Sequence, residues 1–152
     1  MGIIDLGMSL EAEELEKIGK SSRTKEVAGK TVVICSADAH SFGYDIILNI
    51  LGKLGAYVVD GGVGLDPENV VDLIEKHAAS HAAISIHNGQ CVDYAKRLVE
   101  LRKKRNLDVA FFLGGKLNTI EDGTSGPIDA GDILKRLGVI PCKNINKLVN
   151  CF

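Results

Sequence analysis

The chain has 152 residues, a formal net charge of −2, 45% hydrophobic residues and 25% charged residues. This length suits one ordinary domain with a substantial core, and the composition excludes a disordered chain. The charge argues against nucleic-acid binding, because the densest basic run, residues 102–105, ends a predicted helix, where cations favour the helix dipole.

The sequence also indicates in which cellular compartment the protein is expected. It shows no signal peptide and no long apolar span, so we expect a cytoplasmic protein that does not contact a membrane. None of the four cysteines forms a Cys-x-x-Cys pair, and no zinc-ligand spacing occurs. We therefore expect reduced thiols, with Cys35 as a small core residue.

Residues 1–28 differ from the rest of the chain. Ser9 is placed to cap a helix with a thin apolar stripe, and a polar connector follows at residues 21–25. We predict an N-terminal helical arm over residues 1–28 and a domain over residues 29–152.

Strand and helix patterns alternate from Gly29 onward. Strands are predicted at residues 31–36, 56–59, 82–86, 109–113 and 139–142. Helices are predicted at residues 44–54, from Pro67 to about Ala79 after an Asp66 N-cap, at residues 91–104, and from an Asp129 cap to Leu137. A glycine-rich turn is predicted at residues 60–64, a polar loop at 118–127 and one or two helical turns at 144–150.

This alternation predicts an α/β fold, a doubly wound parallel five-stranded sheet in the flavodoxin-like order 2-1-3-4-5. A Rossmann dinucleotide domain is the structural alternative, but the first turn lacks Gly-x-Gly-x-x-Gly. A phosphoacceptor receiver domain needs an Asp at the end of the third strand, where this chain has Ser85 and His87.

Three polar or glycine-rich turns should meet at the carboxyl edge of this sheet. They span residues 38–43, 85–90 and 114–118 and follow the first, third and fourth strands. Ligands of open α/β sheets bind at this edge, where the strand order reverses. The combined polarity of the three turns predicts a binding site there.

Taken singly, the residues of the first turn have ordinary explanations. His40 suits a solvated turn or a metal ligand held by Asp38, and Asp38 suits that role or a helix cap. Gly43 suits a helix start or a space for a flat ligand. His87 is equally compatible with lining the site and with lying beside it. The three turns together favour a ligand site.

Three elements in order carry a resemblance to a known family. They are Asp-x-His-x-x-Gly (Asp38, His40 and Gly43), Ser85-Ile86-His87 followed by Gly89-Gln90, and Gly114-Gly115. Over residues 30 to 142 the chain resembles the cobalamin-binding small subunit of adenosylcobalamin-dependent mutases, most closely that of glutamate mutase (methylaspartate mutase). It departs from the family in having His87 in place of Leu, a short carboxyl end and the N-terminal arm.

The resemblance implies a cobalamin cofactor, adenosylcobalamin rather than methylcobalamin. His40 would be the lower axial ligand of cobalt in place of the cofactor's own base, with Asp38 bonded to its other ring nitrogen. The displaced nucleotide tail would lie near Gly43, Ser85 and Gly114-Gly115. The other implied cofactor contacts are Ala39, Ser41, Phe42, His87, Gly89 and Gln90.

The resemblance also implies a partner. A larger barrel-type mutase subunit would bind substrate and cover the upper face of the corrin, and this chain alone would hold no catalytic residue. An alternative is a corrinoid protein that carries a methyl group between methyltransferases. That class usually has its own helical bundle ahead of the domain, for which residues 1–30 are too short. A cobalamin-based sensor would normally be fused to an output domain.

Overall fold

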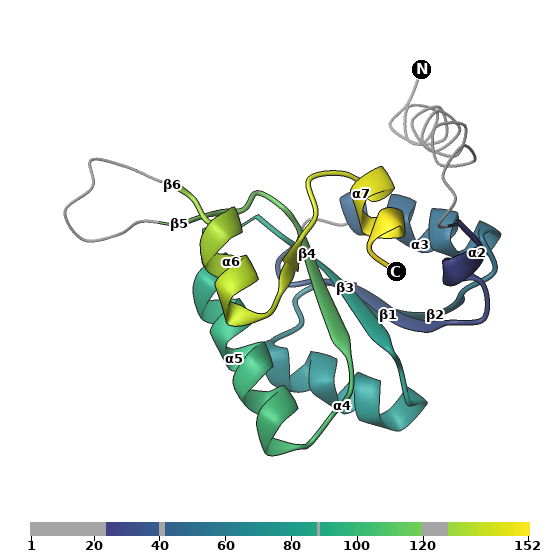
Figure 1. The fold of residues 1–152 in the computed structure, drawn as a ribbon, viewed down its shortest axis with the longest axis horizontal. Coiled ribbons are helices and arrows are strands. Elements are labelled where there is room, and N and C mark those ends of the chain that lie inside the picture. Colours follow the sequence, from purple (N-terminus) through teal and green to yellow (C-terminus); the bar gives the residue numbers. More distant parts are fainter. Residues whose placement is uncertain (1–23, 40–41, 88, 120–127) are drawn as a thin grey trace.

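A computed structural model of the chain describes residues 24–39, 42–87, 89–119 and 128–152 (Figure 1). The helix predicted after Ser9 therefore lies outside the described residues. The described part opens with a short helix, α2 (Thr24–Val27), whose Val27 is buried.

The centre of the fold is a parallel sheet of five strands in the order β2-β1-β3-β4-β7. The strands are β1 (Thr31–Ser36), β2 (Tyr57–Gly62), β3 (His81–Ile86), β4 (Ala110–Gly115) and β7 (Ile140–Pro141). This arrangement confirms the predicted order 2-1-3-4-5. The order reverses between β1 and β3, which are neighbours.

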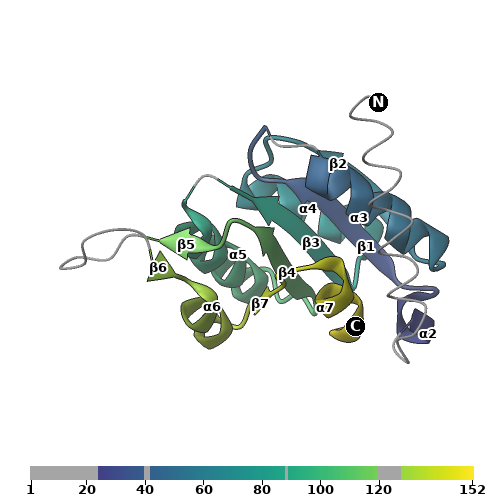
Figure 2. The ribbon, with the colours of Figure 1, turned by 90° about the horizontal axis from the view of Figure 1, so that it is seen from above.

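Helices cover both faces of the sheet (Figures 1 and 2). One face packs against α2, α3 (Phe42–Lys53) and α7 (Ile145–Asn150), and the other packs against α4 (Pro67–His77), α5 (Cys91–Lys104) and α6 (Gly131–Leu137). Successive residues of β1 alternate between the two cores, with Val32 and Ile34 in one and Val33 and Cys35 in the other. Burial on both faces explains why this strand is a continuous apolar run.

Local sequence signals set several of the helix ends. The Asp66 side chain accepts a hydrogen bond from the Asn69 main-chain N–H at 2.8 Å, and the Asn69 side chain accepts one from the Asp66 N–H at 3.3 Å. This capping box, with Pro67 in the first turn, confirms the predicted start of α4. Gly55 has φ +96° just after α3, as predicted for the residue that ends it.

The glycine-rich segment at residues 60–64 is the first difference from the prediction. Two of its glycines, Gly61 and Gly62, belong to β2. The pairing of β1 with β2 changes register beside them, between Ile34 and Cys35. A Cβ on Gly61 would lie 2.9 Å from the Cβ of Cys35, so this glycine allows two strands to approach closely. Its role is in the sheet and not in a turn.

The segment after β4 also differs from the prediction. Gly114 and Gly115 are the last residues of β4, and the predicted polar loop begins as β5 (Asn118–Thr119), which pairs with β6 (Ile128–Asp129) in a separate antiparallel ribbon. Ala130, not Asp129, holds the N-cap position of α6. The Asp129 carboxylate still accepts a bond from the Gly131 N–H at 2.7 Å.

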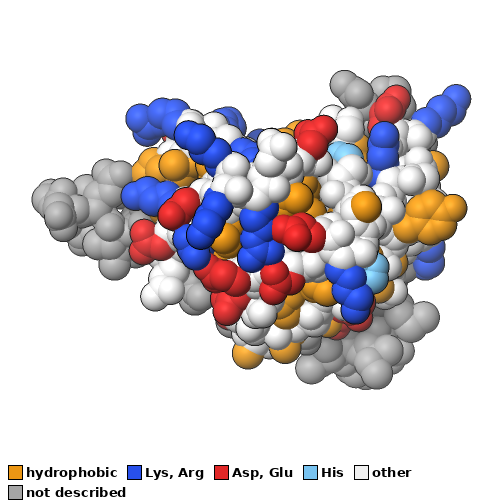
Figure 3. Space-filling model, turned by 90° about the horizontal axis from the view of Figure 1, so that it is seen from below, with side chains coloured by type: hydrophobic (Ala, Val, Ile, Leu, Met, Phe, Trp, Pro, Cys, Tyr) orange, Lys and Arg blue, Asp and Glu red, His pale blue; other side chains and the backbone are white. Residues whose placement is uncertain are grey.

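Two arginines of the basic run at residues 102–105 make contacts within the molecule. Arg105 pairs with Asp72 at 2.7 Å and with Glu75 at 3.2 Å, and Arg102 donates to the Val109 carbonyl at 3.0 Å. Arg97 pairs with Glu68 on the same side of the sheet. Figure 3 shows a face on which Lys and Arg side chains (blue) and Asp and Glu side chains (red) lie close together. Among the described helices, none is both long and apolar enough to cross a membrane.

Candidate functional site

Main-chain hydrogen bonds join the three predicted turns at the carboxyl edge of the sheet. Ala37 N–H, after β1, donates to the Ser85 carbonyl at the end of β3 at 2.8 Å. Lys116 N–H, after β4, donates to the Ile86 carbonyl at 2.9 Å. The ends of β1, β3 and β4 therefore lie side by side, and residues far apart in sequence share one edge.

Asp38 lies where the first two of these turns meet. Its Oδ2 accepts a hydrogen bond from the His87 main-chain N–H at 2.6 Å, and its Oδ1 accepts one from the Ser36 hydroxyl at 3.3 Å. The side chain is only 14% exposed. A carboxylate held by two donors from different strands has a fixed orientation. His40 and Ser41 lie outside the described residues.

His87 was left undecided by the sequence, and the structure places it in the site. Its Nδ1 lies 3.9 Å from the Oδ1 of Asp38, and its side chain is 30% exposed. The imidazole also lines a cavity beside Asp38. Sequence reasoning missed the proximity to Asp38 because the two residues are 49 positions apart.

That cavity, of about 270 Å³, lies between α3 and α7 over the ends of β3 and β4. We refer to it as the interhelical cavity. Its apolar wall comes from both helices and the sheet, and includes Ile46, Ile47, Phe112, Ile145 and Leu148. Its polar lining comprises Ser85, His87, Lys143 and Asn144. An apolar pocket with a few polar groups is the usual form of a small-molecule site.

The structure brings together part of the predicted set. Gly43, Ser85, His87, Gly114 and Gly115 line the interhelical cavity. Ala39, Gly89 and Gln90 are exposed and do not line it. Phe42 begins α3, the helix that forms one wall.

The opposite wall, from Cys142 to Leu148, was missed by the sequence reading. The helical turns predicted at residues 144–150 could have indicated this wall. Ile145 and Leu148 are three positions apart, so in a helix they share one apolar face. Cys142 is buried in this wall, and burial raises its pKa to about 12. It therefore meets the cavity as a neutral thiol.

Two glycines of the site have different reasons to lack a side chain. Gly115 has φ +101°, and a Cβ there would lie 2.5 Å from the Ile86 carbonyl oxygen and 2.9 Å from His87 Cε1. At Gly43 a Cβ would reach only ordinary contact, 3.8 Å from the Ser85 hydroxyl. The fold therefore requires Gly115, whereas Gly43 leaves open space in the cavity lining.

Comparison with known families identifies the family to which this fold belongs. The family described as the B12 binding domain matches residues 29–130. Since this match covers well over half of the chain, the protein belongs to the B12-binding domain family, and its cofactor is cobalamin. A search of curated protein sequences returns no match.

Solved structures with the same fold include three proteins named for a corrinoid or for cobalamin. The monomethylamine corrinoid protein of Methanosarcina barkeri is 20% identical, with a TM-score of 0.64 over 90% of this chain and 61% of that chain. The methanol:cobalamin methyltransferase complex MtaBC of the same organism is 18% identical, with a TM-score of 0.62 over 89% of this chain and 48% of that chain. A cobalamin-binding protein of Desulfitobacterium hafniense DCB-2 is 18% identical, with a TM-score of 0.60 over 80% of this chain and 55% of that chain. This chain thus spans less than two thirds of each, and these identities establish the fold alone.

Gly115 should be far less tolerant of a side chain than other left-handed glycines. We expect Gly115→Ala to lower the free energy of unfolding by about 1–3 kcal/mol more than Gly29→Ala, because only the former adds a clash to the backbone strain. Gly29 is the matched control, since it has φ +80° and no atom within 4 Å of an added Cβ. Urea denaturation measures both, and equal losses would show that the clash at Gly115 is relieved without cost.

Proposed function

We propose that this protein binds cobalamin with the cofactor's own base displaced from cobalt, and with His40 as the lower axial ligand. It would serve as the cofactor-carrying subunit of an adenosylcobalamin-dependent carbon-skeleton mutase of the glutamate mutase kind. The observation that carries this proposal is the interhelical cavity at the carboxyl edge of the sheet, which is lined by His87, the residue whose main-chain N–H donates to Asp38.

The residues around the cavity fit the displaced nucleotide tail. Aliphatic side chains of α3 and α7 and the ring of Phe112 offer apolar surface to a flat aromatic base. Ser85, Asn144 and Lys143 offer hydrogen-bond partners to a ribose and a phosphate. Gly43 adds no side chain to the lining, which keeps this space open, and Gly114 lets the strand end approach the Cys142 carbonyl oxygen, which would lie 3.2 Å from an added Cβ.

Asp38 fits the second half of the proposal. A metal-bound imidazole usually donates its other ring N–H to a carboxylate, which fixes the ring and raises its basicity. Asp38 is two residues from His40 in sequence, and its carboxylate is oriented by Ser36 and by the His87 main chain. When bound, cobalamin supplies a reactive cobalt–carbon bond, while the protein binds, orients and electronically tunes the cofactor.

We expect Asp38→Asn to weaken cobalamin binding by about 10–100-fold while the fold is retained, because the amide is a poorer acceptor for the imidazole N–H. Visible absorption during cobalamin titration measures the affinity, and circular dichroism checks the fold. Asp45→Asn is the control, since Asp45 is an exposed carboxylate in the first turn of α3. Unchanged affinity and spectrum would leave Asp38 with only a structural role between β1 and β3.

A second candidate function is carriage of a methyl group between methyltransferases. It is favoured by the fold shared with the methanol:cobalamin methyltransferase complex and with the monomethylamine corrinoid protein. The same cavity and the same axial histidine would serve it, so the two candidates differ in their upper cofactor group and in their partner.

Turnover assays separate these candidates. We expect no isomerisation when the pure chain is mixed with adenosylcobalamin and glutamate, and product once a barrel-type glutamate mutase subunit is added. The reason is exposure: His87 is 30% exposed at this edge, and radical chemistry needs water excluded. Product formed without a second protein would overturn the subunit assignment. Methyl transfer from methylcobalamin to a methyltransferase, without isomerisation, would favour the second candidate.

A further inference from the structure

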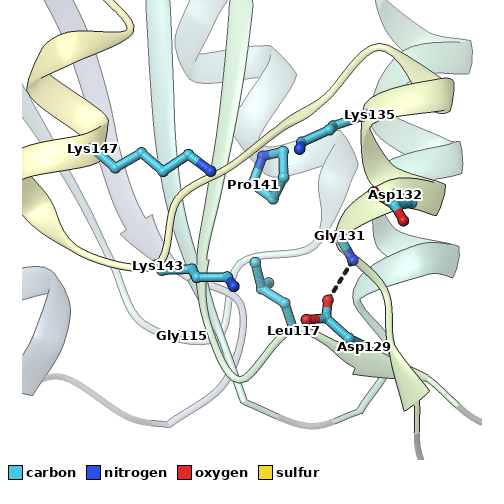
Figure 4. Close-up of a pocket in the computed structure, with 9 residues that line it drawn as sticks. All are labelled: Gly115, Leu117, Asp129, Gly131, Asp132, Lys135, Pro141, Lys143 and Lys147. Carbon is cyan, nitrogen blue, oxygen red and sulfur yellow. Dashed lines mark hydrogen bonds between the residues drawn. The ribbon is translucent and has the colours of Figure 1, made fainter.

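A second cavity, of about 450 Å³, lies at the same edge of the sheet and is bordered by the end of β4, the start of α6 and the segment after β7 (Figure 4). We refer to it as the lysine cavity. Gly115 and Lys143 line both this cavity and the interhelical cavity, so the two are neighbours. Nothing in the proposed axial ligation of cobalt uses the lysine cavity.

Three lysines from different segments converge on this space. Lys135 comes from α6, Lys143 from the turn after β7, and Lys147 from α7. Figure 4 shows the nitrogens of Lys135 and Lys147 directed toward each other on either side of Pro141, and the nitrogen of Lys143 directed toward Leu117. Within the part of the chain that the structure describes, no ion pair joins any of the three to a carboxylate. Converging like charges repel, so a bound anion would relieve this repulsion.

The remaining lining indicates what else the ligand carries. Asp129 and Asp132 also line the cavity, and the Asp129 carboxylate is engaged by the Gly131 N–H at 2.7 Å. Acidic side chains beside a phosphate site commonly accept hydrogen bonds from ribose hydroxyls. Leu117 and Pro141 add apolar surface against which a base can pack. The volume lies in the range of small-molecule sites.

We propose that the lysine cavity binds the phosphate of a ribonucleotide separate from the cofactor. Its main cationic contacts are Lys135 and Lys147, which line this cavity and do not line the interhelical cavity. Lysine is a common phosphate ligand, and each ammonium offers three donors. A ribonucleotide phosphate has two possible sources, a separate nucleotide or the cobalamin tail, and the proposal commits to the first because the tail is assigned to the interhelical cavity. The proposal does not depend on His40 or on base displacement from cobalt.

The test is calorimetric titration of the full chain with ADP, with pyrophosphate, and with cobalamin compared with cobinamide, which lacks the nucleotide. The variant Lys135→Gln/Lys147→Gln should weaken binding of ADP by at least about tenfold. Lys96→Gln/Lys104→Gln is the matched control, because both lysines are exposed on α5 and the same charge is removed. Added salt should also weaken binding of the true ligand.

The arms distinguish the two sources. Binding of ADP that is weakened by the site variant and unchanged by preloaded cobalamin would identify a separate nucleotide. A loss for cobalamin with no loss for cobinamide would show that the lysine cavity holds the cofactor's own phosphate, and would overturn the proposal. Equal effects of the site and control variants in every arm, or no binding of any phosphate compound, would overturn the proposal. A failure of cobalamin binding alone would contradict the proposed function and leave the ADP result to stand.

Discussion

The hydrogen bond from the His87 main chain to the Asp38 carboxylate, at 2.6 Å, joins the two strands at which the sheet reverses its order. β1 and β3 are neighbours only because the chain crosses back after β2. The bond holds the turn after β3 against the turn after β1, and the Ser36 hydroxyl adds a second contact. The ladder between β1 and β3 places their ends on one edge. The bond then fixes the Asp38 carboxylate beside His87, which lines the interhelical cavity, and the proposed site depends on that orientation.

Gly115 adds a steric constraint on the same edge. Its left-handed backbone passes so close to the Ile86 carbonyl and the His87 ring that no side chain fits. This close approach brings the end of β4 against the turn after β3, and from there Gly115 contributes to both cavities. A single glycine thus lines both candidate binding sites, one largely apolar and one cationic.

Local signals predicted the framework, and tertiary contacts decided the site. The strand at 31–36, the helix at 91–104 and the Asp66 cap follow from hydrophobic patterning and capping chemistry within a few residues. The contact between Asp38 and His87 spans 49 positions, and the wall at residues 142–148 forms only when α7 docks beside α3. Gly61 was read as part of a turn because its place in an irregular strand pair depends on the partner strand.

The central claim is that a protein histidine, and not the cofactor's own base, is the axial ligand of cobalt. It is tested most directly by electron paramagnetic resonance of the cobalt(II) form of cobalamin bound to protein made with nitrogen-15 histidine. We predict that the nitrogen splitting changes from a triplet in unlabelled protein to a doublet in labelled protein, and that His40→Ala removes this change. A triplet that persists with labelled histidine would show that the cofactor's base still binds cobalt.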